Sequence, residues 1–143
     1  MSSKELITYV RSEASKLRRT NIRPLTKDTT VKPADTGTTF LSNPSSDALA
    51  ITLPTDLEAG LTYKFIVKTK SAAVTIGAGS AIIVGEVIAD GGTSIPITAG
   101  GNDGTSVTLT TSAVKGDFLE LVCDGTNWYA NGYTGDASGF TVA

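Results

Sequence analysis

DFLELVCDGTNWYANG, residues 117–132, decides the fold class of this chain. Its first half alternates with period two, so the odd-numbered residues of 119–123 face one side of a strand and the even-numbered residues of 118–122 face the other. Asp124-Gly125 is a strong signal for a chain reversal, because glycine accepts a positive φ at little cost. The stretch therefore predicts a hairpin with a central strand. Trp128 is expected to close the core, with its N–H donating to a backbone carbonyl.

The same period recurs along most of the chain, which has 143 residues, 15 of them Gly. Short apolar runs are separated by turn formers such as GAGS, DGGT and CDGTN. Eight segments read as strands: 48–54, 62–69, 73–77, 80–89, 93–99, 106–111, 117–123 and 127–133. No helical pattern separates them. Residues 40–143 are therefore predicted to form a mainly β domain, an antiparallel β-sandwich or jelly roll of about eight strands.

The first 24 residues predict a basic helical arm. Ser2 followed by Glu5 has capping-box spacing, and Leu6, Val10 and Leu17 fall on one face of a helix. Such a helix is marginal alone in water, so it is expected to dock in a groove of a partner. Residues 25–39 have no apolar period and are predicted to be an extended linker between this arm and the β-sandwich domain.

Charge is divided unevenly between the two parts. Residues 1–32 hold eight basic residues against three acidic ones, a net of +5, and the remainder holds four lysines against eleven acids, a net of −7. A basic arm on an acidic body indicates an anionic partner for the arm. Because no aromatic residues interleave with the basic ones in KLRRTNIR (16–23), an acidic protein surface is favoured over nucleic acid.

Several function classes are disfavoured by composition. The chain has no histidine and one cysteine, Cys123, which excludes histidine-based catalysis, histidine metal sites and an internal disulfide. The Gly-rich GAGSAIIVG (77–85) lacks the lysine and the helix of a phosphate loop. No signal peptide is recognised, and AIIVGEVIA (81–89) is about half of the roughly 20 residues that span a bilayer. We expect a protein that is no enzyme, holds no cofactor or metal, and contacts no membrane.

Acidic residues that could suggest chemistry have simpler interpretations. Asp56 with Glu58, and Asp117 with Glu120, are predicted to be solvated surface charges and not the acid pair of a glycosidase. The acids and the amide in the DGG, NDG and DGT motifs are predicted to bond their own turns and not calcium; they are Asp90, Asn102, Asp103 and Asp124.

The order of three segments carries a resemblance. ALAITLP (48–54), AGLTYKF (59–65) and GDFLELVCDGTNWYANG (116–132) together resemble the C-terminal β-domains of tailed-phage virion proteins, over about residues 47–133. Head-decoration (cement) proteins and fibre modules both carry such patterns. The resemblance implies a structural protein, often a homotrimer, at a capsid symmetry axis or a fibre end. It implies no catalytic residues.

From this resemblance we expect a virion protein, made in the host cytoplasm, that binds the outer surface of a capsid. Its arm would bridge subunits of the major capsid protein and stabilise them. The residues expected to make this contact are Leu6, Val10, Arg11, Leu17, Arg18, Arg19 and Arg23.

Two other functions stay open at this point. One is a trimeric tail, fibre or baseplate module that binds a host-surface glycan through exposed Trp128, Tyr129 or Tyr133. The other is a small enzyme on a jelly roll, which the lack of a base tuned near neutral pH disfavours.

Overall fold

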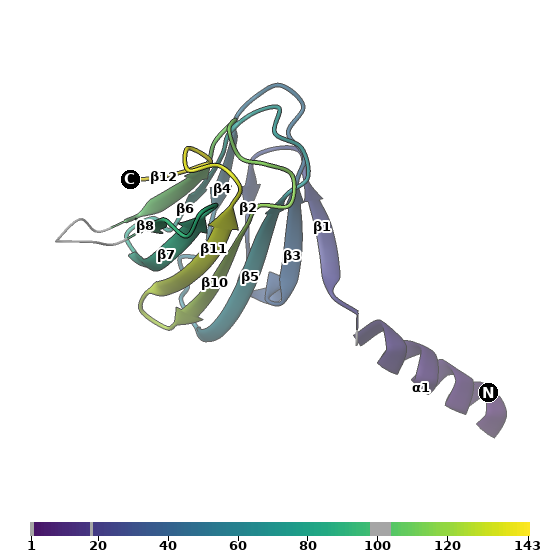
Figure 1. The fold of residues 1–143 in the computed structure, drawn as a ribbon. Coiled ribbons are helices and arrows are strands. Elements are labelled where there is room, and N and C mark those ends of the chain that lie inside the picture. Colours follow the sequence, from purple (N-terminus) through teal and green to yellow (C-terminus); the bar gives the residue numbers. More distant parts are fainter. Residues whose placement is uncertain (1, 18, 98–103) are drawn as a thin grey trace.

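The chain folds into two β-sheets preceded by one N-terminal helix, as Figure 1 shows. This computed structural model describes residues 2–17, 19–97 and 104–143, with the backbone alone for 12–17. The helix is α1 (Ser3–Leu17) and η1 (Pro33–Asp35) is one 3-10 turn. The strands are β1 (Asn21–Leu25), β2 (Thr29–Thr30), β3 (Thr38–Ser42), β4 (Leu49–Thr52), β5 (Ala59–Val67), β6 (Val74–Gly77), β7 (Ile83–Ala89), β8 (Ser94–Pro96), β9 (Ser106–Leu109), β10 (Phe118–Asp124), β11 (Trp128–Thr134) and β12 (Phe140–Val142).

The two sheets enclose one hydrophobic core, as in a β-sandwich. The seven-stranded sheet has the order β1-β3-β5-β10-β11-β7-β8, and the five-stranded sheet has the order β12-β9-β6-β4-β2. Alternate residues of each strand point inward, for example Leu119, Leu121 and Cys123 of β10, as their period predicts. Phe40 stacks on Phe65 at 5.2 Å between centroids, and Tyr63 lies 5.7 Å from Trp128. The predicted mainly β class is confirmed.

The topology differs from the prediction of an antiparallel fold of about eight strands. All eight predicted segments contain strands, but β1, β2, β3 and β12 bring the described total to twelve. Five of the ten strand pairs are parallel, including β1 with β3, β3 with β5 and β4 with β6. The reason is that β1 to β6 alternate between the two sheets. The chain therefore returns to each sheet after one strand in the other sheet, and the new strand runs parallel to its neighbour in the same sheet. A jelly roll is not confirmed.

The segment predicted to be a linker, 25–39, is packed against the sandwich. Leu25 ends the edge strand β1, and Val31 follows β2; both are buried in the core. The main chain of Val31 donates to Thr52 at 2.8 Å, which extends the pairing of β2 with β4. Backbone pairing and these two buried side chains together attach the segment to the β-domain. Part of the range predicted to be an extended linker therefore pairs with strands of the β-domain.

Both edges of the seven-stranded sheet carry a proline on their open side. The carbonyl of Leu25 accepts from the N–H of Asn43 at 2.8 Å, so the neighbouring residue Pro24 directs its backbone toward the free edge of β1. At the other edge the N–H of Ile97 donates to Gly85 at 2.9 Å, which likewise turns Pro96 outward on β8. Proline has no N–H to offer a further strand. These edges are therefore protected from strand addition.

Helix α1 projects away from both sheets at the N-terminal end of β1 (Figure 1). It has 15 residues, and no helix in the described part of the chain is long and apolar enough to cross a membrane.

Candidate interaction surface

The apolar side chains of α1 are among the most exposed large hydrophobic residues of the described chain, together with Ile22 of β1. Leu6, Ile7, Tyr9 and Val10 are 51–56% exposed. The helix starts with the predicted capping box: the N–H of Glu5 donates to Ser2 Oγ at 3.2 Å, and the N–H of Ser2 donates to Glu5 Oε2 at 2.9 Å. Local bonds thus fix where the helix begins, while the side chains of its apolar stripe over residues 6–10 are exposed. Exposed apolar groups at this density indicate a surface that contacts another molecule.

Except for Arg23, the positive charges of the arm whose side chains the structure describes lie in solvent. Arg11 and Arg19 are exposed, and so is Lys4 on the first turn. The exposure of two further predicted contact residues is not described, because the side chain of Leu17 and the whole of Arg18 lie outside the described residues. The predicted combination of apolar stripe and positive charge is therefore present over residues 2–11.

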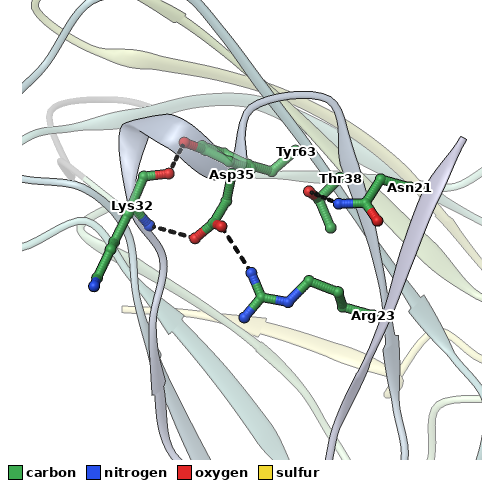
Figure 2. Close-up of polar contacts among 6 residues, drawn as sticks. All are labelled: Asn21, Arg23, Lys32, Asp35, Thr38 and Tyr63. Carbon is green, nitrogen blue, oxygen red and sulfur yellow. Dashed lines mark hydrogen bonds and ion pairs between the residues drawn. The ribbon is translucent and has the colours of Figure 1, made fainter. Parts of the chain in front are cut away.

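Arg23, the last of the predicted contact residues, is engaged within its own chain. Its Nη1 lies 2.8 Å from Oδ1 of Asp35 (Figure 2). Its guanidinium also lies 5.4 Å from the centre of the Phe40 ring. The side chain is 43% exposed, so one face of the guanidinium still meets solvent. Arg23 therefore joins the arm to the β-domain, and only part of it is free for a partner.

Asp35 is the centre of this anchor. Besides the bond to Arg23, its Oδ2 accepts from the N–H of Lys32 at 2.9 Å, which closes the turn η1 (Figure 2). The hydroxyl of Tyr63 donates to the carbonyl of Lys32 at 2.8 Å, and the amide of Asn21 donates to Thr38 at 3.0 Å. Burial, followed by the nearby negative charge of Asp35, raises the pKa of Tyr63 to about 12.

Sequence analysis missed this anchor. Its one local signal was the three-residue spacing of Lys32 and Asp35 around Pro33, which suits a short capped turn. Arg23 lies 12 positions from its partner Asp35, and Tyr63 lies 31 positions from its acceptor Lys32. The parallel register of β1, β3 and β5 brings these residues together.

The outward face of the seven-stranded sheet is the second exposed apolar region. Tyr129 and Tyr133 of β11 are 48% and 40% exposed, with Asn131 between them on the same face. The Tyr129 hydroxyl donates to Oδ2 of Asp124 at 3.1 Å, and this bond raises the pKa of Tyr129. The pKa of Asp124 is lowered chiefly by the N–H groups of Asn127 and Thr126.

Trp128 lies on the opposite face of β11 and is 0% exposed. It closes the core as predicted, but the expected hydrogen bond is absent: among the described residues its Nε1 has no acceptor. An aromatic surface that includes Trp128 is therefore excluded, and of the three rings proposed for glycan binding only Tyr129 and Tyr133 are exposed.

Asp117 and Glu120 both bond to other residues of the β-domain. Asp117 is buried and accepts from the N–H groups of Val114 at 2.8 Å and Gly135 at 3.0 Å and from the Thr134 hydroxyl at 2.8 Å, so the prediction of a solvated charge is wrong for it. Glu120 pairs with Lys64 at 3.1 Å on the outward face.

The turn residues behave as predicted where the structure describes them. Asp90 and Asp124 accept backbone N–H groups of their own turns, whereas Asn102 and Asp103 lie outside the described residues. Within 2–17, 19–97 and 104–143 no group of three potential ligands is placed to hold a metal ion. Cys123 is buried, and its sulfur accepts from the N–H of Gly125 at 3.3 Å.

No family model matches this chain, and no curated protein matches it either.

Proposed function

We propose that this chain is a structural protein of a tailed-phage particle that binds the outer surface of the capsid. In this proposal the β-domain stands on the shell, as part of a homotrimer, and the basic arm lies across subunits of the major capsid protein. The proposal combines the resemblance of residues 47–133 with the properties of α1.

The observation that carries the proposal is the exposed apolar stripe of α1. Leu6 and Val10 lie one helical turn apart and more than half exposed, beside Lys4 and Arg11. A 15-residue helix without tertiary cover is marginally stable, so a partner surface would stabilise both its fold and its position. Major capsid subunits with an acidic groove would fit this helix by shape and by charge.

The anchor supports the same proposal. An arm that holds subunits together must be tied to a domain that stays folded, and here β1, the pair Arg23–Asp35 and buried Leu25 make the tie. A protein that binds only the assembled lattice stabilises that lattice by mass action. The chain's role would then be to strengthen the shell against internal pressure.

The test is binding to purified capsids that lack the protein. Deletion of residues 2–19 removes α1 and leaves β1 with its anchor, so circular dichroism should report an intact β-domain. We expect this truncated protein to stay in the supernatant when capsids are sedimented, while the full chain co-sediments in hundreds of copies per shell.

A charge control separates arm binding from loss of net charge. Lys115→Glu changes an exposed charge of the β-domain and should leave co-sedimentation unchanged. Co-sedimentation of the truncated protein at the level of the full chain would exclude the arm as the capsid contact. A few copies per particle would instead place the protein in the tail or a fibre.

The second candidate is a tail, fibre or baseplate module that binds host glycan. The observation that favours it is the exposure of Tyr129 and Tyr133, with the polar side chain of Asn131 between them. Rings beside amide groups suit the faces and hydroxyls of sugars. Glycan-array binding that Tyr133→Ala abolishes would support this candidate, and an array with no bound sugar would count against it.

A further inference from the structure

Except for Val114, the exposed large hydrophobic residues of the described chain fall into two separate groups, one on the arm and one on the β-domain. Apart from Val114, those of the described β-domain all lie on the outward face of the seven-stranded sheet, and they are Ile22, Val122, Tyr129 and Tyr133. We call this surface the outer face. The outer face and the stripe of α1 both present exposed apolar side chains in the described part of the chain.

A continuous apolar row crosses the outer face. Strand register places six side chains side by side from β1 to β7, and they are Pro24, Leu41, Ile66, Phe118, Tyr133 and Ile88. Five interstrand spacings of about 4.8 Å make this row roughly 24 Å long. Helix α1, with 15 residues rising about 1.5 Å each, is roughly 22 Å long. The row and the helix therefore match in length.

The two surfaces also match in charge. On β5, β7 and β10 the even-numbered residues belong to the outer face. On or at the ends of these strands they include four acidic residues and two lysines: Glu86, Asp90, Glu120 and Asp124, and Lys64 and Lys68. Residues 1–20 hold five basic residues against two acidic ones. A basic amphipathic helix is thus complementary to this acidic, apolar face.

The two edges of the seven-stranded sheet favour association of copies through the outer face and not through the edges. Pro24 and Pro96 deprive the open sides of β1 and β8 of an N–H, so copies are poorly suited to join by strand addition. A hollow of about 240 Å³ on this sheet is lined by side chains that include Thr62, Lys64 and Val122. Its size suits one large apolar side chain of a docked helix.

We infer that the outer face of one copy receives helix α1 of a second copy. Arms passed in one direction around a closed ring would join the copies, and a ring of three would give a homotrimer of the free protein. The same stripe, Leu6 and Val10, cannot contact the capsid and the outer face at once. Self-association would therefore hold the arm in the free protein, and the capsid lattice would compete for it.

The test mixes two full-length variants with complementary defects. The arm variant carries Leu6→Asp and Val10→Asp, and the face variant carries Val122→Lys and Tyr133→Lys; all four positions are exposed, so both variants should fold. We expect wild type to self-associate in sedimentation velocity and each variant alone to be monomeric. An equimolar mixture should form a one-to-one heterodimer, because one intact arm then meets one intact face.

A control places two lysines on the outward side of the other sheet, at exposed Thr52 and Thr141, and should self-associate like wild type. A monomeric wild type, or a mixture without heterodimer, would overturn the inference. Either result is expected if α1 docks on the sheet of its own chain. Self-association that persists in both variants alone would overturn it as well.

Cross-linking identifies the contact. Because the native Cys123 is buried, a Val10→Cys chain mixed with a Tyr133→Cys chain should give a disulfide-linked heterodimer, while Val10→Cys mixed with Thr141→Cys should not. Equal yields from the two mixtures would overturn the inference. Capsids are absent from all of these experiments, so this inference and the proposed function can fail separately.

Discussion

Arg23 and Asp35 form an ion pair with 2.8 Å between Nη1 and Oδ1, and this pair joins the edge strand β1 to the turn η1. The guanidinium also covers the ring of Phe40 at 5.4 Å. The pair is placed where the exposed arm enters the folded domain. Its loss should therefore affect the entry of the arm more than the core.

We predict that Arg23→Gln lowers the free energy of unfolding by about 1 kcal/mol. The pair is partly exposed, which limits its contribution through solvent screening, but the stacking on Phe40 is lost as well. Hydrogen exchange should become faster at backbone amides of β1 and η1 and stay unchanged in β10 and β11.

The pair Lys64–Glu120, at 3.1 Å, is a control for this prediction. Its side chains are exposed to a similar degree, but it lies in central strands, away from the arm. Glu120→Gln should cost about 0.5 kcal/mol or less and leave exchange in β1 unchanged. Equal exchange in β1 for wild type and Arg23→Gln would show that the ion pair does not hold the arm.

The raised pKa of Tyr63, about 12, predicts a loss of stability in alkali. In the unfolded chain the tyrosine ionises near 10, so the folded state holds the proton more tightly. The stabilisation is complete below pH 10 and is lost as the pH rises from 10 toward 12. Tyr63→Phe has no proton to lose, but it removes the bond to Lys32, which should cost about 1 kcal/mol at pH 8.

Urea unfolding of wild type and Tyr63→Phe at pH 8 to 12 measures this effect. The difference in free energy between the two proteins should shrink above pH 10, because only wild type retains this linked ionisation. A difference that stays constant across the range would contradict a raised pKa at Tyr63.

Gly85 allows the parallel pairing of β7 with β11. Its φ is +138°, and a Cβ at this position would lie 1.9 Å from the carbonyl oxygen of Ala130. We predict that Gly85→Ala lowers stability by about 3 kcal/mol or more, because backbone and not a flexible side chain must move. Gly92→Ala is the control: its φ is +84°, but the space around it is open, so it should cost only about 1–2 kcal/mol. Equal thermal shifts for the two variants would contradict this account.

Local patterns predicted the features that depend on neighbours in sequence. The bond between Ser2 and Glu5 spans three residues, and the inward set of Leu119, Leu121 and Cys123 follows from a period of two. Both were confirmed because helix caps and strand faces are set by a few adjacent residues.

Distant pairing was not predictable in the same way. Asn21 pairs with Thr38 and Thr38 with Tyr63, so the parallel half of the sheet joins residues 17 and 25 positions apart. The short turns between strands suggested antiparallel neighbours, which holds for β7 with β8 and for β10 with β11, but β1 to β6 alternate between the two sheets. Arg23 was assigned to a free arm for the same reason, since its partner Asp35 is recognisable only once β1 is known to be a strand.

Trp128 should be a buried, unresponsive fluorophore. Because the ring is 0% exposed and lies against Tyr63, its emission should be blue-shifted and unchanged by added sugars. Trp128→Ala should cost about 3–5 kcal/mol through the cavity it leaves. Trp128→Phe should cost clearly less, because it keeps much of the ring volume and removes an N–H that has no acceptor among the described residues. Chemical denaturation of both variants checks this order. Equal losses of stability in the two variants would mean that the indole N–H has a hydrogen-bond acceptor in solution. A fluorescence emission that changes with added sugar would instead show that Trp128 contacts the sugar.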